Sequence, residues 1–157
     1  MNFARAIHFD ESDRNVYHSP ARTGEWCIPG GFEFSDWTEA DLAGKARQAF
    51  ANGWLGLETF GRVTFVAVTR IEPAEREALI EALAEHFVAM HGAPDVDAAR
   101  PVAIQEVDAM VELCDGVEAN RVMTVARTLG DVGVTETFRI LDARDAELEQ
   151  VAVHFEE

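Results

Sequence analysis

The stretch that most constrains the fold is the apolar run from Arg62 to Ile71. Apolar side chains occupy adjacent positions of this run, so a strand formed here buries both of its faces. Such strands are typical of the interior of a sheet. The Glu72-Pro73 pair directly after it opens a helical pattern that extends to His91-Gly92. We expect the other segments to pack around this strand and helix.

Helical periodicity fills the middle of the chain, and alternating periodicity fills its two ends. Helices are predicted over residues 38–52, from Pro73 to His91, and from near Pro101 to Cys114. Strands are predicted over residues 3–9, 25–28, 54–57, 62–71, 121–128, 134–141 and 151–155. This order predicts an α+β protein, a single domain over residues 1–157, with a mostly antiparallel β-sheet and about three helices packed on it.

Two of these elements carry more detailed expectations. The 73–91 helix presents an apolar face that ends at Met90. Strands 121–128 and 134–141 form a hairpin whose longer loop contains residues 130–133.

The net charge is the unusual bulk property, because 29 acidic residues face 13 basic ones and give −16. Phosphate backbones need clustered Lys and Arg, so nucleic acid and anionic membranes are excluded as partners. No apolar run reaches the length of a membrane span, and the N-terminus lacks a signal-peptide core. Two widely separated cysteines indicate free thiols in a reducing compartment, so we expect a cytoplasmic protein.

Motifs for catalysis and cofactor binding are missing from the sequence. It contains no phosphate-binding loop, nucleophile elbow or paired Cys/His spacing, so no cofactor and no metal site are predicted. Cys27 alternates with Trp26 and Ile28 and faces either a pocket or the second side of a sheet. Catalysis by this thiol would require a neighbouring base or helix N-terminus that the sequence does not place.

His86 falls on the apolar side of the 73–91 helix. It is either a core histidine with satisfied ring nitrogens or a pocket histidine that acts as acid, base or ligand. His91 lies about 140° from His86 on a helical wheel, so the two rings are not expected to share a metal ion.

The most distinctive chemistry is the aromatic segment from Trp26 to Trp37, where large rings flank a Pro-Gly-Gly bend. Adjacent glycines permit positive φ or close approach of another backbone. The rings either close one end of the core or form an exposed patch for a partner or flat ligand. The candidate contact residues are Trp26, Pro29, Gly30, Gly31, Phe32 and Trp37, with His86 as the pocket candidate.

Several short runs carry a resemblance to a known family. They are Gly24-Glu25-Trp26, Pro29-Gly30-Gly31-Phe32, residues 44–50, Gly92-Ala93-Pro94-Asp95 and Ala126-Arg127-Thr128-Leu129. Together they resemble a small proteobacterial family catalogued as a domain of unknown function. The resemblance spans nearly the whole chain and implies no particular activity, so no functional residue follows from it.

Three functions remain open at this point. The first is a non-catalytic binding or accessory protein that contacts a partner through the aromatic segment. The second is a small-molecule-binding protein or minor enzyme with a pocket around His86. The third is a structural homodimer, with an acid-poor interface on a helix face or near residues 151–155.

Overall fold

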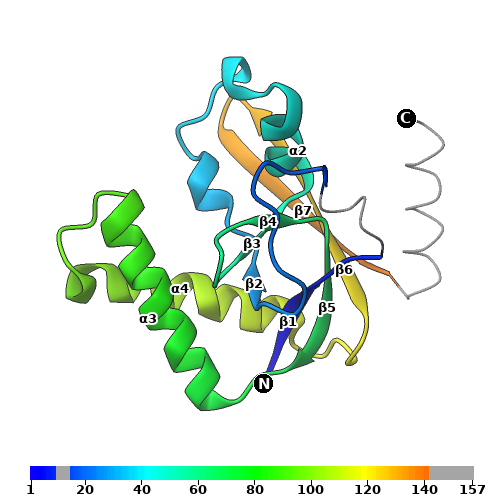
Figure 1. Cartoon of the computed structure of the whole chain (residues 1–157), viewed down its shortest axis with the longest axis vertical. Coiled ribbons are helices and arrows are strands. Elements are labelled where there is room, and N and C mark those ends of the chain that lie inside the picture. The colour runs from blue at the N-terminus through cyan, green and yellow to red at the C-terminus, as the bar shows by residue number, and fades with distance from the viewer. Residues whose placement is uncertain (10–14, 142–157) are drawn as a thin grey trace.

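The computed structural model describes residues 1–9 and 15–141. Within these ranges the chain forms two antiparallel sheets, three α-helices and two short 3-10 helices (Figure 1). The larger sheet has the strand order β1-β5-β6-β7, and the smaller has the order β2-β3-β4. The strands are β1 (Asn2–Ile7), β2 (Cys27–Ile28), β3 (Trp54–Gly56), β4 (Arg62–Val63), β5 (Phe65–Arg70), β6 (Val122–Gly130) and β7 (Gly133–Leu141). The helices are η1 (Gly31–Phe34), η2 (Glu39–Asp41), α2 (Gly44–Asn52), α3 (Pro73–Met90) and α4 (Val96–Cys114). The predicted α+β class is confirmed.

The apolar run at 62–71 contributes to both sheets. Its first two residues form β4 of the smaller sheet, and after Thr64 the chain continues as β5 of the larger one. The prediction of an interior strand is confirmed for β5, which lies between β1 and β6. The prediction of one continuous strand is wrong. Arg62 and Val63 are buried within the smaller sheet, so this end of the run belongs to a different sheet from β5.

Helix α3 begins as predicted. Pro73 is its first residue, and Glu72 and Glu75 form a capping box around it. Leu79, Leu83 and Phe87 are buried. Met90, however, is the last residue of the helix and is 68% exposed, so the buried face ends at Phe87.

The third predicted helix starts earlier than expected. Helix α4 begins at Val96, because the Asp95 side chain accepts a hydrogen bond from the Ala98 backbone and caps it. Pro101 therefore lies inside the helix, on its exposed side, rather than in the first turn. The predicted 38–52 helix is also divided into η2 and α2, with Gly44 at positive φ where α2 begins.

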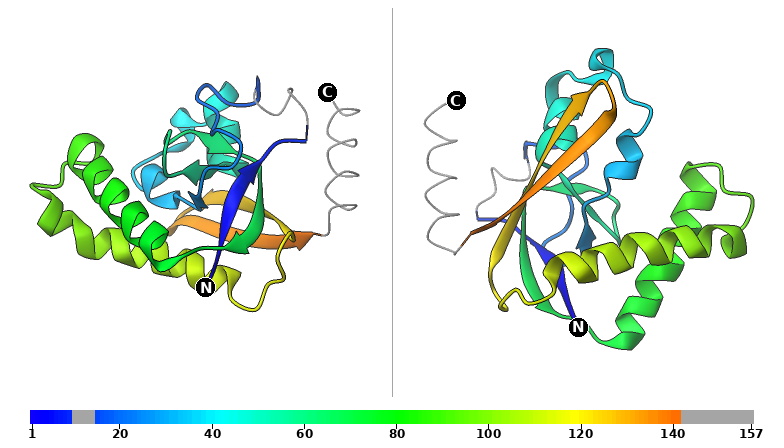
Figure 2. Two further views of the ribbon diagram at one scale, coloured as in Figure 1. Left: turned by 60° about the horizontal axis from the view of Figure 1, so that its bottom comes forward. Right: turned by 180° about the vertical axis from the view of Figure 1, so that it is seen from behind.

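Strands β6 and β7 form the predicted hairpin. Their pairing continues to Gly130 and Gly133, so a two-residue turn joins them instead of the longer loop expected. Figure 2 shows the hairpin extending towards α2, which packs against β6, while α3 and α4 lie together at another side. The predicted strand at 151–155 lies outside the described residues.

One buried cluster joins both sheets to α3 and α4. The segment from Pro29 to Phe34 leaves the smaller sheet and passes between this core, α3 and the β6–β7 hairpin. The elements therefore bring η1 close to the end of α3, although about fifty residues separate them in sequence.

Candidate metal centre

The bend at Pro29-Gly30-Gly31 determines where η1 points. Gly30 has φ 68°, and a Cβ there would lie 2.5 Å from Leu55 Cβ. Both facts require glycine at this position. The bend turns the chain out of β2 and starts η1, whose third residue is Glu33.

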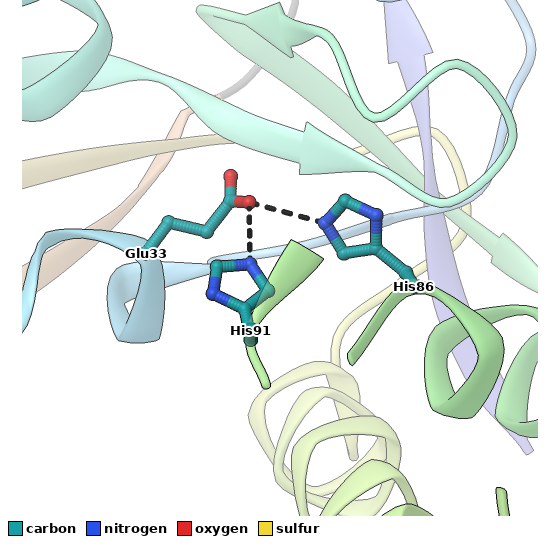
Figure 3. A group of neighbouring side chains, drawn as sticks. All are labelled: Glu33, His86 and His91. Atoms are coloured by element: carbon teal, nitrogen blue, oxygen red, sulfur yellow. Dashed lines mark hydrogen bonds and ion pairs between the residues drawn. The ribbon is translucent and has the colours of Figure 1, made fainter. Parts of the chain in front are cut away.

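The Glu33 carboxylate contacts three side chains. Oε1 accepts a hydrogen bond from Arg62 Nη2 at 2.7 Å. Oε2 lies 3.1 Å from the Nε2 atoms of both His86 and His91 (Figure 3). Arg62 therefore orients the carboxylate so that one oxygen faces both imidazoles.

The two histidines approach each other at the end of α3. The expectation that their rings diverge is wrong, since the ring centroids are 5.2 Å apart. His91 is the C-cap residue, with φ −124° and ψ 15°, so the helical wheel does not apply to it. The chain leaves the helix at His91, and this residue turns back towards η1.

Aromatic rings fix both imidazoles. Phe60 stacks on His86 with 3.8 Å between centroids and 1° between planes. Phe32 meets His91 edge to face at 5.4 Å. Phe60 has φ 57°, an uncommon conformation for a bulky residue, and this strain is consistent with a functional position.

The same loop is held in place by a buried carboxylate. Glu25 accepts hydrogen bonds from the backbone N–H groups of Glu58 and Thr59 and from the Thr59 hydroxyl. These contacts position the residue before Phe60, and so they help to set the ring that lies against His86.

Electrostatics keep Glu33 ionised. Burial alone would raise the pKa of this carboxyl, but the Arg62 charge and hydrogen bonds from His86, Arg62 and His91 together lower it. An ionised carboxylate accepts hydrogen bonds and can also bind a cation.

Glu33, His86 and His91 each offer one atom suited to metal binding, and these atoms lie within 4.8 Å of one another. Zinc bonds of about 2.0–2.2 Å place neighbouring ligand atoms of a tetrahedral site roughly 3.3 Å apart. The two 3.1 Å separations at Glu33 Oε2 are close to this value. A bound metal ion would take the place of the two Nε2 hydrogen bonds that Glu33 Oε2 accepts. Three protein ligands would leave at least one coordination position open.

A second buried arginine supports the same bend. Arg62 and Arg127 both donate to the carbonyl oxygens of Pro29 and Gly53. Each guanidinium also lies over the Phe34 ring, at 4.5 and 5.2 Å from its centroid. Arg127 Nε then binds Glu136 Oε2 at 2.7 Å. Each buried arginine thus orients one glutamate.

The structure separates the members of the predicted aromatic segment. Trp26 is buried between Phe3 and Arg5. Trp37 is half-buried against Phe34 and Phe50. The remaining contact candidates lie at the bend, where Gly30 is packed against Leu55 and Arg62 while Pro29, Gly31 and Phe32 line a cleft.

Both cysteines are fully buried free thiols. Burial raises the pKa of Cys27 well above its usual value, and the charge of Glu25 raises it further. This environment opposes formation of the nucleophilic thiolate.

The sequence patterns do not single out Glu33, Arg62 or Arg127, and the helical wheel places His86 and His91 apart. Glu33 stands in a run of aromatic residues with no recognised metal-binding spacing. The available signal was the pair of arginines in apolar strands, since an arginine in a buried strand requires carbonyl or carboxylate partners nearby.

The fold and this cluster define an α+β protein with a carboxylate and two histidines gathered at the end of a helix. The chain belongs to the family of unknown function DUF6505, which matches residues 1–157. Neither a curated protein nor a solved structure matches the chain. The expected resemblance to a family of unknown function is therefore confirmed.

Proposed function

We propose that this protein binds one divalent transition-metal ion through Glu33, His86 and His91. The observation that carries the proposal is the approach of both Nε2 atoms to one carboxylate oxygen, each at 3.1 Å. Three side chains from two separate segments converge there, and packed rings restrict both imidazoles. Such pre-organisation favours binding, because little side-chain entropy is lost when the ion enters.

The donor set indicates the class of metal. Two imidazoles and one carboxylate suit zinc or iron(II), whereas calcium and magnesium prefer all-oxygen sites. Arg62 would act from outside the coordination shell by holding Glu33 Oε1, an arrangement that commonly orients metal ligands. The positions left open by three protein ligands would be available to water or a small ligand.

The test is metal binding by protein stripped with a chelator and then dialysed against Zn²⁺ or Co²⁺. We expect one ion per chain by elemental analysis and a higher melting temperature, because a ligand that binds only the folded state stabilises it. Binding should weaken at acidic pH, since metal ligands must be deprotonated.

Two variants test the proposed metal site, and a third serves as their control. Loss of an outer-shell partner typically weakens metal binding about 10–100-fold. His91 is proposed as a direct ligand, so His91→Ala should weaken binding by at least the upper end of that range, about 100-fold. Glu33→Gln should act similarly while preserving side-chain size. His18→Ala is the matched control, because His18 is exposed and is not part of the cluster. Equal binding by His91→Ala and His18→Ala would overturn the proposal.

The proposal includes a location and a type of role. Cytoplasmic placement is supported by the two free thiols, which suit a reducing compartment. Among the described residues, no helix combines the length and apolar character required to cross a membrane. The role proposed is binding, with the acidic chain attracting cations rather than nucleic acid.

A further inference from the structure

A cleft of about 760 Å³ opens between η1, α4 and β7. This volume lies within the range of small-molecule sites. The cleft has apolar walls, formed by Phe32, Leu113, Val134 and Phe138. Phe32 also contacts His91, so the cleft adjoins the candidate metal centre but has its own lining.

Three carboxylates line the same cleft. Glu106 and Glu112 come from α4, and Glu136 comes from β7. Glu136 is paired with Arg127, whose side chain is 0% exposed. Among the described residues that line the cleft, none carries a positive charge.

Glu106 lacks a partner inside the described part of the chain. It is half-buried, and no hydrogen bond or ion pair satisfies its carboxylate there. Burial, and next the charge of Glu136, raise the pKa of Glu106. A partly desolvated, unpaired carboxylate costs stability, which is a common property of binding sites.

We infer that the cleft binds a small organic cation, an ammonium or guanidinium group carried on an aromatic or aliphatic body. Glu106 and Glu112 supply charge-assisted hydrogen bonds to the cationic group. The rings of Phe32 and Phe138 contact the apolar body and add cation–π attraction. This site goes beyond the proposed metal binding and does not depend on it.

The test uses phenethylamine as probe and phenethyl alcohol as its neutral analogue. Each is titrated into ¹⁵N-labelled protein, and the backbone amide shifts are recorded by NMR. We expect saturable shifts with the amine at Gly31, Phe32 and Val134, and binding of the alcohol at least about tenfold weaker. Absence of saturable binding, or equal binding of amine and alcohol, overturns the inference.

Variants separate a local effect from the overall negative charge. Glu106→Gln and Glu112→Gln should each weaken amine binding about tenfold or more. Glu85→Gln removes the same charge from the exposed side of α3 and should leave binding unchanged. Glu106→Gln should also retain Zn²⁺ binding, so failure of the cleft is distinguishable from failure of the metal centre. Equal losses in the Glu85 and Glu106 variants would overturn the inference.

Discussion

Arg62 and Arg127 donate hydrogen bonds to the same two carbonyl oxygens, those of Pro29 and Gly53. Two like charges are thereby buried side by side, and burial, with Arg127 as a further cause, lowers the pKa of Arg62 to about 10. This value still lies above neutral pH, so the Arg62 guanidinium remains charged there. Each arginine has one glutamate as counter-charge, Glu33 for Arg62 and Glu136 for Arg127. One structural network thus connects the candidate metal centre to the cleft.

Replacing Arg62 with methionine should strongly destabilise the protein. The change removes the partner of Glu33 and leaves the carbonyl groups of Pro29, Gly30 and Gly53 with fewer donors. Breaking a buried pair in this way costs about 3–5 kcal/mol. Urea denaturation of Arg62→Met measures this loss. The control is Arg70→Met, which alters an exposed arginine and should change stability by less than about 0.5 kcal/mol. Similar losses for the two variants would contradict a structural role of Arg62.

Glu106→Gln should stabilise the protein at neutral pH. Because the folded-state pKa of Glu106 is raised, folding favours its protonated form. The stabilisation that comes from this raised pKa is fully present below the pKa of Glu106 in the unfolded state. It is lost as the pH rises through the pKa of Glu106 in the folded state. The neutral amide removes that loss, so we expect a melting temperature roughly 1–3 °C higher at pH 7. The gain should disappear near pH 3. Melting curves of the variant and the wild-type protein at pH 3 and pH 7 measure this gain. The same difference in melting temperature at both pH values would contradict the prediction.

The thiols of Cys27 and Cys114 should react slowly in the folded protein. Both are inaccessible, and burial raises the pKa of Cys114 to about 12. A disulfide-exchange reagent at pH 8 should therefore modify the native protein only as fast as it opens. In guanidinium chloride the same reagent should titrate two thiols per chain. Rapid reaction of either thiol in the native state would show that its surroundings open locally.

Periodicity was sufficient to predict most of the secondary structure. The capped start of α3, the interior strand β5 and the β6–β7 hairpin each depend on local sequence or on burial of a regular face. The errors occurred where a few residues outweigh the pattern. Asp95 caps α4 ahead of Pro101, and the chain changes sheets after Thr64.

The candidate metal centre is harder to predict from the sequence than the secondary structure is. Its three ligands come from η1 and from the end of α3, and only tertiary packing brings these segments together. The helical wheel separated His86 from His91, because it assumes that the helix continues through its own C-cap. Glu33 is oriented by Arg62, through a partly buried contact between positions 29 residues apart.

Gly56→Ala should reveal the link between the core and the candidate metal centre. A Cβ at Gly56 would lie within 1.9 Å of Glu25 Oε1, so the carboxylate must move. That movement breaks its hydrogen bonds to Glu58 and Thr59 and frees the loop that places Phe60 on His86. Overpacking of this kind costs about 1–3 kcal/mol.

The matched control for Gly56→Ala is Gly130→Ala. A Cβ at Gly130 meets only the Gly133 carbonyl oxygen, at 3.8 Å, and the residue has no positive φ. Urea denaturation should show a loss for Gly56→Ala that the control lacks. Zn²⁺ titration under conditions where both variants are folded should show weaker binding for Gly56→Ala alone, because His86 loses its stacked support. Reduced stability with unchanged Zn²⁺ affinity would place Glu25 in the core without any part in orienting the imidazole.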